Sequence, residues 1–201
     1  MSMPLLMDID ATAQKIVEIF EKLDKPFAFT GGLAAITYGD PRTTNGVDII
    51  MKINPWEIDF AKAMAKVLAD VLGGDFYFSI EACREAIEKQ TMFQAVDLKT
   101  MVKIDFHLSD IVPGSCDRRQ NTRIPTGQIV PMVIPEDSIL SKLVWIKLGS
   151  GISRKDVVAV LRVQKDLDTD YLETTAKQLG VEQILNELKI IAGSNDPNII
   201  F

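Results

Sequence analysis

The chain has 201 residues, enough for one large domain or two small ones, and 47% of them are apolar, which suffices for a buried core. Its formal net charge of −6 argues against broad, unspecific attraction to nucleic acid. No apolar run approaches the ~20 residues that a membrane span needs, and the acidic start of the chain predicts no export signal. The two cysteines, Cys83 and Cys116, have no metal-ligand spacing. We therefore expect a soluble cytoplasmic protein with reduced thiols and no membrane association.

The first part of the chain is expected to alternate helices with short strands. Apolar residues at helical spacing predict an amphipathic helix that ends before Pro26. A buried strand then runs into a Gly-Gly turn and a brief helix, and a second strand stops at Asn54, where Pro55 suits a helix start. The elements expected are helix 10–23, strand 27–30, helix 33–38, strand 47–53 and helix 56–72.

The middle of the chain is expected to be rich in strands and the end to be helical. Four of the nine prolines fall in 109–135, so this segment is predicted to be loop with a single short strand, 129–133. The other elements expected are strand 76–78, helix 79–89, paired strands 92–98 and 101–108, and helices 136–148, 154–164, 169–179 and 181–191. Strands first and helices last predict an α+β fold, with a sheet domain over 1–135 and a helical C-terminal part over 136–201.

The most informative stretch runs from Gly31 to Ile50. Gly31 and Gly32 stand where a strand meets a helix, and glycines at such a place let a triphosphate approach backbone N–H groups and the positive helix end. Taken alone, the glycine pair fits a plain turn better than a nucleotide site. Here it is followed in order by an Arg-x-Thr motif that begins with Arg42 and Thr43, and by an acidic strand that carries Asp48.

In this order of motifs the sequence resembles the nucleotidyltransferases of the DNA polymerase beta superfamily, and in particular its minimal and abortive-infection toxin-like members. The resemblance covers roughly residues 10–180. It implies a mixed nucleotidyltransferase-type sheet flanked by helices. In the family one strand carries two carboxylates separated by one residue, and a neighbouring strand supplies a third. Asp48 matches the second position and Asp105 the third, whereas Gly46 stands at the first.

The resemblance also implies a set of site residues. Mg²⁺ or Mn²⁺ would be held by the catalytic carboxylates of Asp48 and Asp105. A nucleoside triphosphate would lie against Gly31, Gly32, Arg42, Thr43 and Lys142. By strand alternation His107 and Lys103 share a face with Asp105, so His107 is either a contact near the metal or an ordinary strand histidine. Trp56 and Trp145 are predicted to belong to the core.

Gly46 departs from the family pattern. Two carboxylates are still enough protein ligands for one ion, whose remaining coordination positions would be filled by water and phosphate. Loss of a charged ligand is nonetheless expected to slow phosphoryl transfer by orders of magnitude. Asp40 and Asn45 are near enough in sequence to be candidates for compensation, and Asn45-Gly46 equally suits a tight turn. If a missing ligand weakens the site, Gly46→Asp should raise its affinity for metal.

Two hypotheses from different classes follow. The first is a metal-dependent nucleotidyltransferase that moves a nucleoside monophosphate from a triphosphate to an unknown hydroxyl on a tRNA, a protein or a small molecule. The second is a catalytically degenerate protein that binds nucleotide or a partner protein, as one half of a toxin–antitoxin pair. A third, regulatory nucleic-acid binding through Arg118, Arg119 and Arg123, is disfavoured by the acidic balance of the chain.

Overall fold

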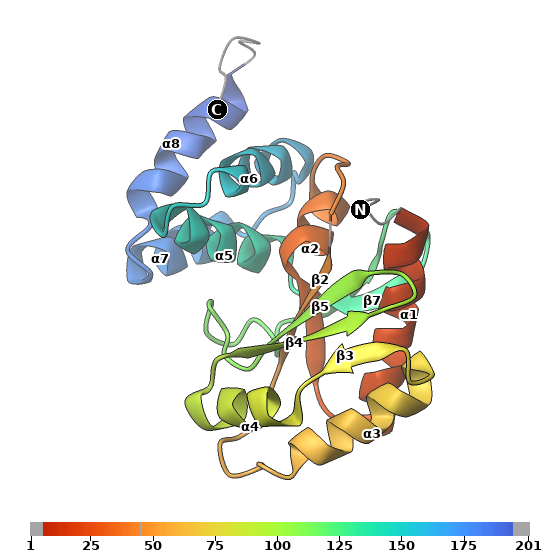
Figure 1. Ribbon diagram of the computed structural model, residues 1–201. Coiled ribbons are helices and arrows are strands. Elements are labelled where there is room, and N and C mark those ends of the chain that lie inside the picture. The colour runs from red at the N-terminus through yellow and green to blue at the C-terminus, as the bar shows by residue number, and fades with distance from the viewer. Residues whose placement is uncertain (1–5, 45, 195–201) are drawn as a thin grey trace.

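A mixed seven-stranded sheet lies at the centre of the computed structural model, which describes residues 6–44 and 46–194 (Figure 1). The strand order across the sheet is β3-β4-β5-β2-β1-β7-β6. Strand β2 is parallel to β5 and β1 is parallel to β7, while the other neighbours are antiparallel. The strands are β1 (Phe27–Thr30), β2 (Gly46–Met51), β3 (Phe76–Phe78), β4 (Met92–Asp97), β5 (Val102–His107), β6 (Gln120–Arg123) and β7 (Ile129–Met132).

Helices flank this sheet and follow it, which confirms the α+β class. The first four are α1 (Leu6–Leu23), α2 (Gly31–Tyr38), α3 (Phe60–Leu72) and α4 (Ile80–Lys89). The last four are α5 (Pro135–Lys147), α6 (Ile152–Val163), α7 (Thr169–Gln178) and α8 (Glu182–Gly193). Figure 1 shows α5–α8 gathered at one end of the molecule, beyond α2, while α1, α3 and α4 lie along the sheet. The described strands all precede Pro135, and the division into two domains there stays a prediction.

Side-chain alternation gives the sheet an apolar face and a polar face. Phe106 of β5 is fully buried, stacks on Phe93 of β4 with ring centroids 4.9 Å apart, and lies 6.2 Å from the ring of Phe20 in α1. Because neighbouring residues of a strand point to opposite faces, Asp105 and His107 lie on the other side of β5. Helix α1 therefore covers the apolar face, and the polar face is left for the site.

Several sequence predictions are wrong, each for a local reason. The segment 109–135 contains two paired strands rather than the single strand predicted. Strand β6 was missed because its residues are polar and give no apolar pattern. Helix α3 begins at Phe60 rather than at residue 56, and Trp56 is 78% exposed. Trp145 is 43% exposed, so neither tryptophan belongs to the core.

Other predictions agree with the structure. Cys83 and Cys116 are both buried and unpaired. Within the two described ranges, none of the helices combines the length and the apolar character that crossing a membrane would require. The cytoplasmic location stays a prediction.

Candidate functional site

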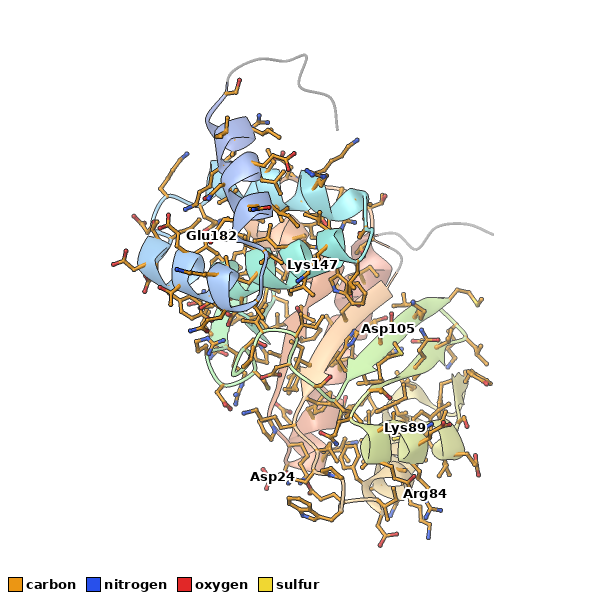
Figure 2. All side chains as sticks on the ribbon, turned by 90° about the vertical axis from the view of Figure 1, so that its left-hand side faces the viewer. Asp24, Arg84, Lys89, Asp105, Lys147 and Glu182 are labelled. Atoms are coloured by element: carbon orange, nitrogen blue, oxygen red, sulfur yellow. The ribbon has the colours of Figure 1, made fainter. Side chains whose placement is uncertain are left out.

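Asp48 and Asp105 are brought together by the pairing of β2 with β5. They are register partners on these parallel strands, so both carboxylates lie on the polar face, as the sequence pattern predicts. Figure 2 shows Asp105 on the sheet, between the C-terminal helices that carry Lys147 and Glu182 and the helix that carries Arg84 and Lys89. The next register pair on the same face of the sheet joins Ile50 to His107.

The Asp48 carboxylate lies against the first turn of α2. This helix begins at Gly31, two residues earlier than predicted, and the Gly32 N–H donates a hydrogen bond of 3.2 Å to Asp48 Oδ2. Gly31 has a φ of +59°, and a Cβ there would overlap the carboxylate, so the position requires glycine twice over. Free N–H groups and the helix dipole favour a negative charge at such a turn. The Gly32 N–H, which was predicted to lie against a triphosphate, therefore donates its hydrogen bond to Asp48.

Several contacts act on the ionisation of Asp48. Burial alone would raise the pKa of this carboxyl, but the contact with His107, the Gly32 hydrogen bond and the charge of Lys142 outweigh it and hold the pKa below its ordinary value. His107 Nε2 lies 3.6 Å from Asp48 Oδ1. Asp48 is thus an ionised carboxylate at neutral pH, which is the form that a divalent cation requires.

Asp105 is neutralised by its own neighbours. Lys103 Nζ lies 2.7 Å from Asp105 Oδ2, and Gln94 Nε2 donates a hydrogen bond of 2.8 Å to Oδ1. The Lys103 side chain is 47% exposed and is therefore free to swing into solvent. A cation at Asp105 would have to displace this ammonium group.

Gly46 is required by the packing of β2 on β5. A Cβ at this position would lie 2.6 Å from the carbonyl oxygen of Lys103, closer than any ordinary contact. The obstacle is this neighbouring strand and not a left-handed backbone, because Gly46 has no positive φ. Of the candidates for compensation, Asp40 is exposed and Asn45 lies outside the described residues. Across the described part of the chain, no three His, Cys, Asp or Glu side chains are grouped closely enough to hold a metal.

A buried ion triad joins the loop after α2 to the C-terminal helices. Asp156 of α6, only 5% exposed, accepts hydrogen bonds of 2.7 and 2.9 Å from Arg42 Nε and Nη2. Lys142 Nζ of α5 lies 2.7 Å from Asp156 Oδ2. Burial would raise the pKa of Asp156, but the Arg42 hydrogen bonds and the Lys142 charge outweigh it and hold the pKa below its usual range. The predicted nucleotide contact Arg42 is thus held by α6.

A cavity of about 170 Å³ opens beside Asp48, between the sheet and α5. Four predicted site residues line it: Gly31, Gly32, Asp48 and Lys142. Lys142 thus reaches the cavity from α5, and its contact with a triphosphate stays a prediction. Asp105, Arg42 and Thr43 are not part of the cavity wall, and Thr43 is exposed. His107 and Trp145, which the sequence analysis also discusses, line it as well. The rest of the wall is made by Thr30, Ile50, Ser109, Ile111, Val112, Ser115, Val133, Asp137 and Ser141.

The three arginines considered for nucleic-acid binding are engaged in contacts within the chain. Arg118 donates hydrogen bonds of 3.0 and 3.1 Å to the buried carboxylate of Asp137. Arg119 donates to a backbone carbonyl at 2.8 Å, and Arg123 to another at 2.6 Å. They therefore do not form a free basic patch.

No protein-family model and no curated protein matches the sequence. Among solved structures, the crystal structure of an antigenic nucleotidyltransferase-like protein from Paracoccidioides brasiliensis is similar, with a TM-score of 0.56, 16% identity and 94% of each chain covered. The solution structure of the antibiotic-resistance factor ANT(2'')-Ia covers 90% of each chain at 14% identity, and its TM-score of 0.46 is too low to carry an argument. The first likeness shows that the chain has a nucleotidyltransferase-like fold.

Proposed function

We propose that the protein is a metal-dependent nucleotidyltransferase, which moves a nucleoside monophosphate from a triphosphate to a hydroxyl acceptor. The observation that carries this proposal is the register pairing of Asp48 with Asp105 beside the first turn of α2, with Asp48 and Lys142 lining one cavity. Paired carboxylates suit a divalent cation, while a helix N-terminus and an ammonium group suit phosphate. The minimal or abortive-infection subfamily stays a prediction.

The carboxylates present fit one Mg²⁺ or Mn²⁺ ion. Mg²⁺ is commonly bound through one or two carboxylates plus water and substrate phosphates, and Asp48 and Asp105 offer that number. When bound there, the cation supplies neutralisation of the phosphate charge. A second ion would lack the shared ligand that Gly46 cannot provide.

The residues of the chain would bind and orient the reactants. The Lys142 ammonium and the first turn of α2 would hold the phosphates, and Arg42 would keep its loop on α6 through Asp156. The acceptor oxygen forms a bond to the α-phosphorus as the bond to the bridging oxygen breaks. Pyrophosphate leaves and the acceptor proton passes to solvent. A tRNA, a protein hydroxyl and a small molecule all stay open as acceptors.

A second candidate function is nucleotide or partner binding without catalysis, as one half of a toxin–antitoxin pair. Gly46 favours it, because the Lys103 carbonyl leaves no room at this position for the side chain that would carry the missing carboxylate. A site that cannot hold two ions loses much of the charge neutralisation that phosphoryl transfer needs.

Calorimetry followed by a pyrophosphate-release assay tests both candidates. Each nucleoside triphosphate is titrated with Mg²⁺ into wild type, Asp48→Asn and the control Asp59→Asn, whose side chain is 91% exposed on another surface. Binding that only Asp48→Asn abolishes, with pyrophosphate released when an acceptor is added, supports the transferase. Binding with no release for tRNA, protein and small-molecule acceptors supports the second candidate. If no triphosphate binds, the nucleotide site is rejected.

A further inference from the structure

Two parts of the chain that lie far apart in sequence both contribute to the wall of the cavity beside Asp48. One is the segment 109–119, which comes after β5, and the other is helix α5. The wall residues from the segment are Ser109, Ile111, Val112 and Ser115, and those from the helix are Asp137, Ser141, Lys142 and Trp145. The shape of the cavity therefore depends on how this segment is held against α5.

Arg118 joins the segment to α5. Its Nε and Nη2 donate hydrogen bonds of 3.0 and 3.1 Å to the two carboxylate oxygens of Asp137, whose side chain is fully buried. Two parallel bonds from a guanidinium group to one carboxylate fix the orientation of the two groups as well as their distance. Since Asp137 is itself one of the wall residues, the bonds attach the segment to the part of α5 that lines the cavity.

The same guanidinium group also orders the segment internally. Arg118 Nη2 donates a further hydrogen bond of 2.9 Å to the carbonyl oxygen of Pro113. Gly114 has a φ of +79°, and a Cβ on it would lie 2.7 Å from Arg118 Nη1, so the backbone turn lies directly against this side chain. Loss of the guanidinium group would thus loosen the segment and detach it from α5 at the same time.

Tyr171 of α7 is the third member of this group. Its hydroxyl donates a hydrogen bond of 2.6 Å to Asp137 Oδ1, and Arg118 Cζ lies 5.1 Å from the centroid of its ring. Burial and the Asp137 carboxylate raise the pKa of Tyr171 to about 12, so the hydroxyl remains a donor at neutral pH. The hydrogen bond of Tyr171 joins two C-terminal helices to each other, whereas the bonds of Arg118 join the segment to one of them.

We propose that Arg118 is a positioning residue of the nucleotide site, which fixes the segment 109–119 on α5 through Asp137 and so preorganises the cavity. A ligand binds more tightly when the walls of its site need not be ordered on binding. The inference rests on the proposed function, because it concerns the same cavity, and it assigns to Arg118 a role within the chain rather than a contact with the ligand.

Hydrogen exchange and calorimetry on Arg118→Met test this role, with Tyr171→Phe as the matched control. In Arg118→Met the amides of Ser115 and Asp117, which bond within the segment, should exchange about tenfold faster than in wild type. ATP, GTP, CTP and UTP are titrated with Mg²⁺, and those that bind wild type should bind this variant about tenfold more weakly.

Tyr171→Phe also removes a donor from Asp137, but it keeps the ring beside Arg118 and leaves the bonds to the segment in place. It should lower Tm by about 2–4 °C and change neither the exchange of the segment nor the affinity. Arg118→Lys provides a second variant in case Arg118→Met does not fold. One ammonium group cannot reproduce the fork that bonds Asp137 and Pro113, so the segment should still exchange faster than in wild type and affinity should fall about threefold.

The results separate this inference from the proposed function. Wild-type exchange or wild-type affinity in Arg118→Met, or in Arg118→Lys where Arg118→Met does not fold, would overturn the positioning role while leaving the nucleotide site in place. An equal loss of affinity in Tyr171→Phe would also overturn it, because lower stability alone would then explain the loss. If none of these triphosphates binds wild type, the proposed function is rejected, and the role of Arg118 with it.

Discussion

Removal of the Asp156 carboxylate should destabilise the protein strongly. Asp156→Ala leaves Arg42 and Lys142 without the anion that both contact. The Arg42 side chain is 28% exposed and can turn to water, but the Lys142 side chain is only 9% exposed. Breaking a buried ion pair by removing one partner costs about 3–5 kcal/mol. Because Arg42 can relax, we expect the lower end, about 3 kcal/mol in the free energy of unfolding.

The chain offers a matched control for this change. Arg154 and Glu187 form the same two-bonded pair, at 2.9 and 3.0 Å, but their side chains are 31% and 52% exposed. Exposed pairs contribute roughly 0–1 kcal/mol, so Glu187→Ala should be nearly neutral. The two variants thus differ in the burial of the carboxylate that each removes.

Urea unfolding followed by circular dichroism measures both variants against wild type. A loss of about 3 kcal/mol corresponds to a fall in Tm of roughly 6–12 °C for a chain of this size. If Asp156→Ala unfolds at the same urea midpoint as Glu187→Ala, the triad does not hold the loop of Arg42 on the C-terminal helices, and the reasoning from burial is refuted.

Four further predictions concern the site. Gly46→Ala and Gly46→Asp should each lower the free energy of unfolding by about 1–3 kcal/mol, because either Cβ meets the neighbouring strand; wild-type urea midpoints would contradict this. Lys103→Met should raise Mg²⁺ affinity about two- to fivefold in calorimetry by releasing Asp105, whereas Lys99→Met, which breaks an exposed pair, should not. The depressed pKa of Asp156 adds stability that is complete above the ordinary Asp value of about 4 and is lost as the pH falls through the depressed value. Asp156→Asn should therefore show a shallower loss of Tm below about pH 4 than wild type, and parallel curves would contradict it. Mg²⁺ and a nucleoside triphosphate should each raise the affinity for the other, and independent affinities in paired titrations would count against the site.

The order of elements was open to prediction because it follows from short-range patterns, and the pairing of the two carboxylate strands was implied by the family resemblance. Alternation along a strand specifies which face Asp48 and Asp105 share once their strands are neighbours. The Asp156 triad was not predictable in this way. Arg42 and Asp156 are 114 residues apart, and an acid within an apolar helical stretch was the only local signal. The Lys103 carbonyl of β5 leaves no room for a side chain at Gly46, and this too depends on how the strands pack. A glycine within a strand suggests such a close approach but does not identify the neighbouring group.

The charges of the site compensate one another before any ligand arrives. Three carboxylates and three cations balance in charge when His107 is left out of the count: Asp48, Asp105, Asp156, Arg42, Lys103 and Lys142. A metal ion alone would compete with the Lys103 ammonium for Asp105, and a triphosphate alone would compete with Asp48 for the Gly32 N–H. A metal bound to a triphosphate brings both charges at once, so the carboxylates gain a cation while the freed N–H and ammonium groups gain phosphate oxygens. Such a site favours the complex over either of its components, and this is the physical reason to expect metal and nucleotide to bind together.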